Sequence, residues 1–466
     1  MTEKFNYDDI KYLAVALPDT VKALRGAGKF AEELEEIERL TSRGVDPVLG
    51  KRLMLEKFIA KHMMKDYGVD RAKMLAMLSE KYDGVDDGVL DEIIKSRHAD
   101  YILTSDGLRF QNDAYSNVVR IMHKRLTKLR ENSGLTSDSG ASEPDKLLHE
   151  NIAEMKKNGR NSYRFVIRES IKPDAEHEIS GKLVRAWLPY PCRCAEQSGI
   201  ELVSSSHNVT LSPDSHPIST AYTEFEYHAG EKFEITVAYT NTAVYHELNP
   251  EYAVEGYPAE CGEYTLEELP QIVFTPYLRY LASYLAGDEK NPLLVAKRFY
   301  DYITENVKYS FLREYRLIDN IPETVALNLY GDCGAQSLLF ITLCRIKGIP
   351  ARWQSGNSVT PGGIGSHDWA LFYVAPFGWL YADCSCGGGM YRDGDRVGRE
   401  WYFGNLDPFR YVGSQKFASQ LSPAKDYMRI DPFDNQSGEI EYSDGVLDSD
   451  EIDFEKTVVD SKRITE

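Results

Sequence analysis

The stretch that decides the fold runs from Gly331 to Arg352 and reads GDCGAQSLLFITLCRIKGIPAR. Asp332 is a residue type that caps helix N-termini, and Gly348 followed by Pro350 is a typical helix stop. Most side chains between them are apolar, which predicts a helix buried in the core. Cys333 then lies in the first turn, where unpaired backbone N–H groups and the helix dipole favour a thiolate over a thiol.

Two segments further along the chain supply the partners that such a cysteine needs. SHDWALFYV (Ser366–Val374) and GWLYADCS (Gly378–Ser385) read as two strands joined by a turn. If odd positions of one strand pair with odd positions of the other, His367 and Asp383 lie on the same face of the sheet. A register centred on Ala375 would place the two residues directly opposite each other. Other registers remain open. Cysteine, histidine and aspartate in this chain order supply a nucleophile, its base and the group that orients the base.

Together these three segments resemble the core of the transglutaminase-like superfamily of papain-related thiol enzymes, over roughly residues 266–410. The resemblance implies an α+β fold: a papain-like core in which a helix with an N-terminal cysteine packs on an antiparallel sheet. It implies Cys333 as nucleophile, His367 as base and later acid, and Asp383 as the holder of the imidazole. The oxyanion donors are expected to be the Cys333 backbone N–H and an earlier residue. Tyr309 is the candidate, with a packed aromatic as the alternative.

Patterning along the rest of the chain predicts several further parts. Apolar residues at helical spacing in 30–41, 51–64, 71–81 and 112–130 indicate a small helical domain, without a fixed repeat period. A Ser- and Gly-rich break at 132–144 precedes a short helix that ends at Asn158-Gly159. A β domain follows, and it contains the segment WLPYP. This domain resembles the β domain that often precedes the core in bacterial members of the superfamily. The predicted organisation is a helical domain 1–131, a linker and short helix 132–161, a β-sandwich-like domain 162–245, a transglutaminase-like catalytic core 262–420 and an acidic C-terminal tail 421–466.

The tail prediction depends on charge. Residues 439–466 carry ten acidic and three basic side chains, which is typical of a solvated or loosely attached segment. Ile440-Glu441-Tyr442 is the one part that could pair as an edge strand.

Composition excludes several classes of partner. The net charge is −19, from 73 acidic and 54 basic residues, which disfavours nucleic acid and anionic membranes because both need a clustered basic surface. No run approaches about 18 uninterrupted apolar residues, so no membrane span is expected. The first ten residues lack the apolar core of a signal peptide, and seven cysteines are an odd number for a disulfide scaffold. We therefore expect a cytoplasmic protein, and the resemblance to bacterial members of the superfamily implies a bacterial one.

Four cysteines form two Cys-x-Cys pairs, Cys192/Cys194 and Cys384/Cys386. Four thiolates can bind zinc, but structural zinc sites usually space their ligands more widely, and no histidine pairs accompany these. We expect no metal and no cofactor. Cys386 stands where the family commonly has a bulky residue, so a second thiol is expected near the site.

The function expected from these observations is attack on an amide carbonyl, formation of a thioester and transfer of the acyl group to water. Such an enzyme is a peptidase or amidase whose partner is a peptide or protein substrate. Transfer of the acyl group to an amine, by a protein-glutamine transglutaminase, is the alternative with the same chemistry, because the cleft chooses the acceptor. A non-catalytic binding or scaffold protein is the alternative from another class.

Overall fold

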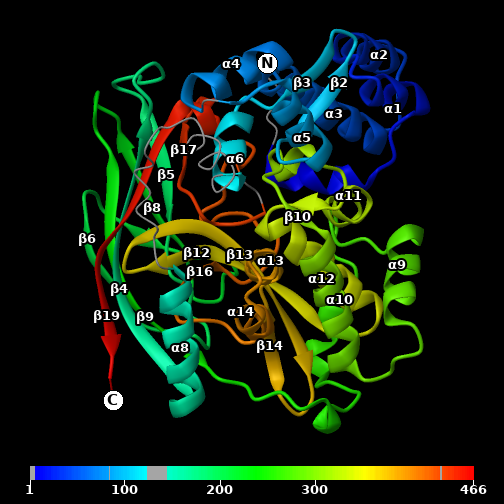
Figure 1. Ribbon diagram of the computed structural model, residues 1–466. Helices are drawn as coiled ribbons and strands as arrows, with labels where there is room; N and C mark the ends of the chain where they lie inside the picture. Colours follow the sequence, from blue (N-terminus) through cyan, green and yellow to red (C-terminus); the bar gives the residue numbers. More distant parts are fainter. Residues whose placement is uncertain (1–5, 83, 123–143, 431–432, 466) are drawn as a thin grey trace.

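The structure is a computed structural model that describes residues 6–82, 84–122, 144–430 and 433–465. It mixes helices and sheets, and the predicted α+β fold is confirmed. In Figure 1 the N-terminal helices lie at the top, a β-sandwich lies on the left and the helix-and-sheet core lies below and to the right.

The N-terminal part is mainly helical, but the sequence analysis missed a small sheet in it. The strands are β1 (Val69–Asp70), β2 (Tyr101–Thr104) and β3 (Gly107–Phe110), in the order β1-β3-β2. The β2–β3 hairpin turns through Ser105-Asp106-Gly107, and Gly107 has a φ of 106°, which favours glycine. The helices are η1 (Tyr7–Ala14), α1 (Asp19–Gly26), α2 (Phe30–Ser42), α3 (Pro47–Asp66), α4 (Arg71–Lys81), α5 (Asp87–Ser96) and α6 (Ala114–Ile121).

The predicted helix over 112–130 corresponds to α6, and its remainder from 123 lies outside the described residues, as does the break up to 143. Beyond it, α8 (Pro144–Asn158) ends where the sequence predicted, and Gly159 has a φ of 75°.

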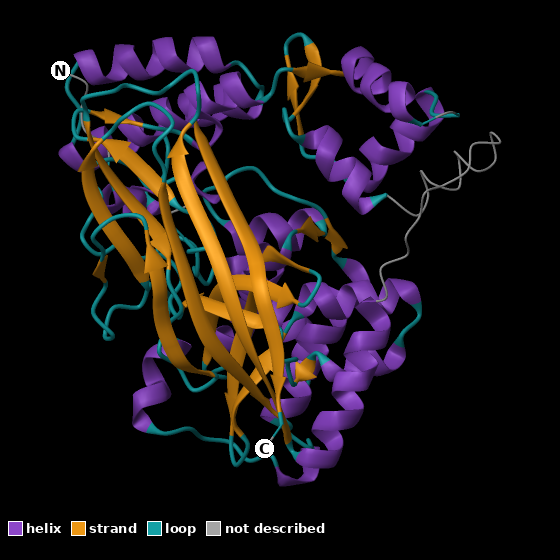
Figure 2. Cartoon of the chain, turned by 90° about the vertical axis from the view of Figure 1, so that its left-hand side faces the viewer, coloured by secondary structure: helices purple, strands orange, loops and turns teal. Residues whose placement is uncertain are grey.

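Two antiparallel sheets form the β-sandwich, which Figure 2 shows face on. One has the order β19-β4-β9-β6 and the other β18-β17-β5-β8-β7. Their inner faces enclose an apolar cluster that includes Phe165, Ile235 and Ile440. The strands are β4 (Arg160–Pro173), β5 (Leu183–Pro189), β6 (Gln197–Ser205), β7 (Thr210–Leu211), β8 (Thr220–Glu226), β9 (Phe233–Val244), β17 (Glu439–Tyr442), β18 (Gly445–Val446) and β19 (Ile452–Ile464).

The prediction of a solvated or loosely attached segment over 439–466 was wrong, whereas the pairing considered for Ile440-Glu441-Tyr442 is present in β17. Strand β19 pairs with β4 along almost its whole length, and β17 pairs with β5, so the C-terminal segment completes both sheets. Charge misled the prediction because alternate residues of β19 point to solvent and carry most of the charges, while Ile452, Phe454 and Val458 pack against the sandwich core.

The core consists of helices packed against the sheet β15-β14-β13-β12-β16. Helix α12 (Cys333–Ile346) packs directly on this sheet, and every residue from Cys333 to Arg345 is buried. The other helices are α9 (Pro276–Ala286), α10 (Pro292–Asn306), α11 (Ile321–Asn328), α13 (Cys384–Asp393) and α14 (Arg396–Trp401). The strands are β12 (Ala351–Thr360), β13 (Gly363–Val374), β14 (Gly378–Ala382), β15 (Phe403–Gly404) and β16 (Arg410–Ser414), and a separate strand pair joins β10 (Lys308–Tyr309) to β11 (Tyr330–Gly331).

The β13–β14 hairpin has a different register from the one centred on Ala375. Leu371 pairs with Tyr381 and Val374 with Gly378, so the centre lies at Pro376. A shift of this size keeps odd positions paired with odd positions, and His367 and Asp383 therefore still share a face, as diagonal rather than direct neighbours.

Candidate active site

Cys333 lies at the N-terminus of α12, where two local interactions fix the helix start. Asp332 caps the helix by accepting a hydrogen bond from the Ala335 backbone N–H at 3.1 Å, and the Tyr315 hydroxyl donates to the same carboxylate. The Cys333 thiol is 8% exposed. Its Sγ donates to Oδ2 of Asp368 at 3.4 Å, which is an aspartate on β13 immediately after His367.

The surroundings of Cys333 favour the neutral thiol. Burial raises the pKa of the Cys333 thiol well above its ordinary value, and the charges of Asp368 and Asp332 raise it further, although the Asp368 backbone N–H acts in the opposite direction. Burial and these two carboxylates therefore act against the thiolate that the helix start favours.

His367 and Asp383 form the second half of the site. Nε2 of His367 lies 2.7 Å from Oδ2 of Asp383, which also forms an ion pair with Nη2 of Arg410 at 3.1 Å. Burial alone would raise the pKa of the fully buried Asp383 carboxyl, but His367 and Arg410 hold it well below its usual range. Asp383 also caps α13 by accepting from the Cys386 backbone N–H at 3.0 Å, so its carboxylate is fixed from several sides.

Cys386 is the second thiol expected near the site. Its Sγ lies 3.6 Å from Nε2 of His367, and burial raises the pKa of this thiol well above its ordinary value. Within the described part of the chain, His367, Asp383 and Cys386 are the one group close enough to share a metal ion. The Arg410 guanidinium beside Asp383 disfavours a cation there. The two Cys-x-Cys pairs do not come together as a four-thiolate site among the described residues.

Cys333 opens into a cavity of about 690 Å³ between the core, the N-terminal domain and the C-terminal segment. Tyr309 lines the same cavity and stacks edge-on against Phe311, with ring centroids 5.4 Å apart. Most charged side chains of the lining are acidic. The N-terminal domain contributes His62, Asp66, Gln111, Asn112, Asp113 and Asn117, and the C-terminal segment contributes Asp434, Gln436, Ser437, Asp448, Ser449 and Asp450.

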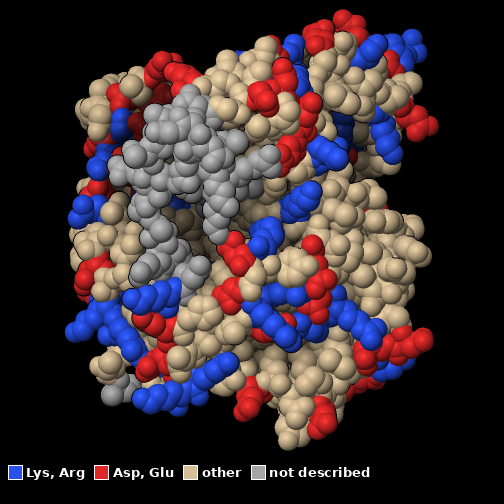
Figure 3. Space-filling model, in the orientation of Figure 1, with Lys and Arg blue, Asp and Glu red and all other residues tan. Residues whose placement is uncertain are grey.

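Ion pairs join these parts around the cavity. His62 lies 2.9 Å from Asp448, which also accepts from Arg316 at 2.6 Å, and Arg313 forms two bonds with Asp100. On the face drawn in Figure 3, positive and negative side chains are interspersed. The helical N-terminal domain therefore forms one wall of the cavity into which the cysteine opens.

The structure brings together His367 and Asp383, and places Cys333 and Tyr309 at one cavity. Among the described residues the hydrogen bond of the Cys333 thiol goes to Asp368 and not to the imidazole. The sequence analysis missed Asp368 and Arg410 as neighbours of the site. Asp368 had a signal, because it directly follows the histidine in SHDW; Arg410 reaches Asp383 from a distant strand, and no local pattern marks it.

Residues 279–384 match the family model described as the transglutaminase-like superfamily. The chain carries a transglutaminase-like domain. The matched segment runs from α9 to the first residue of α13, so the transglutaminase-like domain includes Cys333, His367 and Asp383. A comparison with curated proteins gave no match.

Solved structures similar to the chain include a candidate protease and a bacterial periplasmic domain, both at low identity. A candidate cysteine protease from Cytophaga hutchinsonii is 12% identical, with a TM-score of 0.37, over 66% of this chain and 90% of that one. The periplasmic domain of TgpA from Pseudomonas aeruginosa is 12% identical, with a TM-score of 0.28, over 53% of this chain and 95% of that one. Among the described residues, no helix beside the transglutaminase-like domain or within it is long and apolar enough to cross a membrane.

Proposed function

We propose that the protein is a thiol acyl-transfer enzyme in which Cys333 is the nucleophile, His367 the base and Asp383 the group that holds the imidazole. The observation that carries this proposal is the local arrangement at the cavity. The Cys333 thiol at the start of α12 donates a hydrogen bond to Asp368, which directly follows His367 in the sequence. Nε2 of His367 is in turn hydrogen-bonded to the buried, ionised Asp383. An imidazole held in this way has a defined tautomer, with the proton on Nε2 and an acceptor at Nδ1.

The mechanism follows from this tautomer. Because the resting thiol is neutral, His367 takes its proton through Nδ1 as Sγ attacks the amide carbonyl. That step requires the thiol to turn from Asp368 toward the imidazole. The developing oxyanion is within reach of the Cys333 backbone N–H, and Tyr309 is the second proposed donor. His367 then protonates the leaving amine, and the thioester remains on Cys333.

Water is the proposed acceptor of the acyl group, which makes the enzyme a peptidase or amidase acting on a peptide-like substrate. The transglutaminase alternative shares every step up to the thioester and differs only in the acceptor. The cytoplasmic location stays a prediction.

The test compares Cys333→Ala with Cys344→Ala, a matched change in the same buried helix. The purified proteins are incubated with a library of peptide amides, with and without a millimolar alkylamine, and products are followed by mass. We expect wild type and Cys344→Ala to release free acid, and Cys333→Ala to lose on the order of 10³-fold or more in kcat/KM.

Full turnover by Cys333→Ala would contradict the proposed nucleophile. A product mostly conjugated to the amine, formed at the expense of free acid, would favour the transglutaminase alternative. Circular dichroism of both variants checks that the fold is retained.

A further inference from the structure

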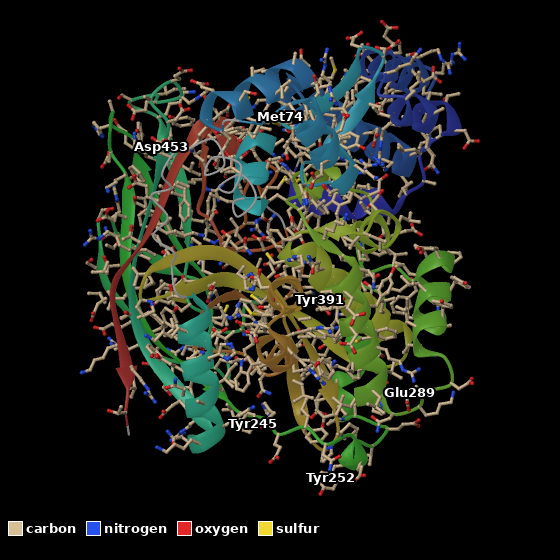
Figure 4. All side chains as sticks on the ribbon, in the orientation of Figure 1. Met74, Tyr245, Tyr252, Glu289, Tyr391 and Asp453 are labelled. Carbon is tan, nitrogen blue, oxygen red and sulfur yellow. The ribbon has the colours of Figure 1, made fainter. Side chains whose placement is uncertain are left out.

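A lysine from the C-terminal strand reaches into the catalytic sheet. Lys456 lies on the inward side of β19, and its Nζ donates to Oδ1 of Asn357 at 2.5 Å, to Oγ of Ser366 at 2.8 Å and to the backbone carbonyl of Gln436 at 3.1 Å. Asn357 and Ser366 are cross-strand partners on β12 and β13, one pair away from His367. Figure 4 shows β19, labelled at Asp453, running along the sandwich.

The amide of Asn357 is buried and incompletely bonded. The residue is fully buried, and its Nδ2 has no hydrogen-bond partner among the described residues. Its carbonyl oxygen, in contrast, accepts the short bond from Lys456. The contact brings Nζ close to the carbonyl carbon to which that oxygen is attached, so an amine and an electrophilic carbon are already neighbours.

Glu169 supplies an acid in the same cluster. It pairs with Lys456 across the β4–β19 ladder, is fully buried, and neither carboxyl oxygen has a hydrogen-bond partner in the described chain. Burial raises the pKa of Glu169 to about 8 and lowers the pKa of Lys456 to about 8. Burial therefore favours the neutral acid and the neutral amine, although the charge of each group acts against this shift in the other.

Glu169 and Asn357 also share a neighbour. Tyr411 pairs with Asn357 across the β12–β16 ladder, and the Glu169 charge contributes to raising the pKa of the Tyr411 hydroxyl. Glu169 and Asn357 thus both lie near Tyr411, while Lys456 bonds to Asn357 and pairs with Glu169 across the ladder.

We propose that Lys456 and Asn357 join in an intramolecular amide bond, with Glu169 relaying the proton. The lone pair of Nζ forms a bond to Cγ of Asn357, while the Glu169 acid donates toward the Asn357 carbonyl oxygen and stabilises the tetrahedral intermediate. The proton that Nζ loses passes through Glu169 to Nδ2. The bond between Cγ and Nδ2 then breaks, and ammonia leaves. Amine and amide give a new amide and ammonia, so no oxidant or cofactor is needed, and Glu169 ends protonated as it began.

The bond would tie β19 to β12 beside His367. It is independent of the proposed acyl transfer at Cys333, because none of its three residues belongs to that site.

The test is the intact mass of the denatured, full-length wild-type protein. We expect a mass about 17 Da below the sequence mass, which corresponds to loss of ammonia. Proteolysis followed by tandem mass spectrometry should yield a branched peptide that joins the segments around Asn357 and Lys456. Lys456→Arg should restore the full mass, Glu169→Gln should leave most of the protein uncrosslinked, and Lys462→Arg on the same strand should keep the bond.

Several outcomes would overturn the proposal, and the wild-type mass decides it even if a variant fails to fold. A wild-type mass equal to the sequence mass would show an ordinary ammonium with three oxygen acceptors. A loss of about 18 Da would indicate an amide between Lys456 and a carboxyl. A loss of 17 Da (approximately) that maps to a linear peptide would indicate a cyclised asparagine instead. Complete cross-linking in Glu169→Gln would remove Glu169 from the reaction.

Discussion

Asp383 and Glu169 are both fully buried carboxyl groups on inward-facing positions, yet their surroundings are opposite. Asp383 meets a histidine, an arginine and a helix N-terminus, which together keep it ionised. Glu169 has no hydrogen-bond partner among the described residues, and burial raises its pKa to about 8. Burial by itself therefore does not decide whether a carboxyl group is charged. The hydrogen-bond donors and positive charges that the fold places around the group decide it.

The largest expected effect is on kcat/KM, which should depend much more on Asp383 than on Glu169. Asp383→Asn should lower kcat/KM on the order of 10²–10⁴-fold, because the amide cannot fix the same imidazole tautomer or stabilise its positive charge. Glu169→Gln should lower it less than about tenfold, because a neutral group of the same shape replaces a mostly neutral acid. Steady-state kinetics of both variants measure the difference. Equal losses of kcat/KM in the two variants would mean that the Asp383 and Glu169 carboxyl groups do not differ in their role in turnover.

A second, smaller effect concerns the arginine that keeps Asp383 charged. Arg410→Gln should raise the Asp383 pKa and destabilise the fold by about 3–5 kcal/mol, because the buried carboxylate loses a charged partner. The lowered pKa of Asp383 contributes stability that is present above its unfolded value and lost as the pH falls through the folded value. In Arg410→Gln the folded-state pKa of Asp383 is higher, so this contribution is smaller and is fully lost at a higher pH.

Chemical unfolding between pH 3 and 7, together with the acidic limb of kcat/KM, measures this shift. Arg410→Lys is the matched control, since it keeps the charge and should retain most of the wild-type profile. An unchanged acidic limb in Arg410→Gln would show that His367 alone keeps Asp383 ionised.

The smallest expected effect concerns Asp66, a carboxyl group in the wall of the cavity. Burial, followed by the charge of Glu314, raises the pKa of Asp66 to about 6. A raised pKa of an acid disfavours the charged folded form, so its cost appears as the pH rises from about 4 to 6 and persists above. Asp66→Asn should therefore raise the free energy of unfolding by about 1–2 kcal/mol at pH 7 and leave it unchanged near pH 3. Denaturant melts at both pH values provide the measurement, and equal gains at both would contradict the assignment.

The sequence predicted the parts of the fold that depend on local patterns. The buried α12 and its Asp332 cap, the end of α8 at Asn158 and the shared face of His367 and Asp383 follow from periodicity, capping chemistry and the alternation of strands. Local patterns could not predict the pairing of β19 with β4, because a charged outer face looks like a solvated tail until a partner strand covers its other side.

The candidate site also has features that the sequence predicted and features that depend on tertiary contacts. The residue types and their order marked Cys333, His367 and Asp383, whereas the state of the thiol depends on Asp368, and the charge of Asp383 on Arg410. These effects are tertiary, since they arise where separate strands and a helix end meet. Helix-start chemistry alone leaves out burial and the Asp368 carboxylate, both of which favour the neutral thiol.

The pairing of β4 with β19 has a consequence for the order of events during synthesis. Strand β4 is synthesised well before β19, so the edge of β4 that β19 covers stays unpaired until β19 is made. Contacts so distant in sequence form slowly. Since β19 also delivers Lys456 beside the catalytic sheet, and the neighbouring Asp448 closes one wall of the cavity, the thiol centre is completed only once β19 is made. Cys333 therefore stays in an unfinished setting from its own synthesis until that of β19.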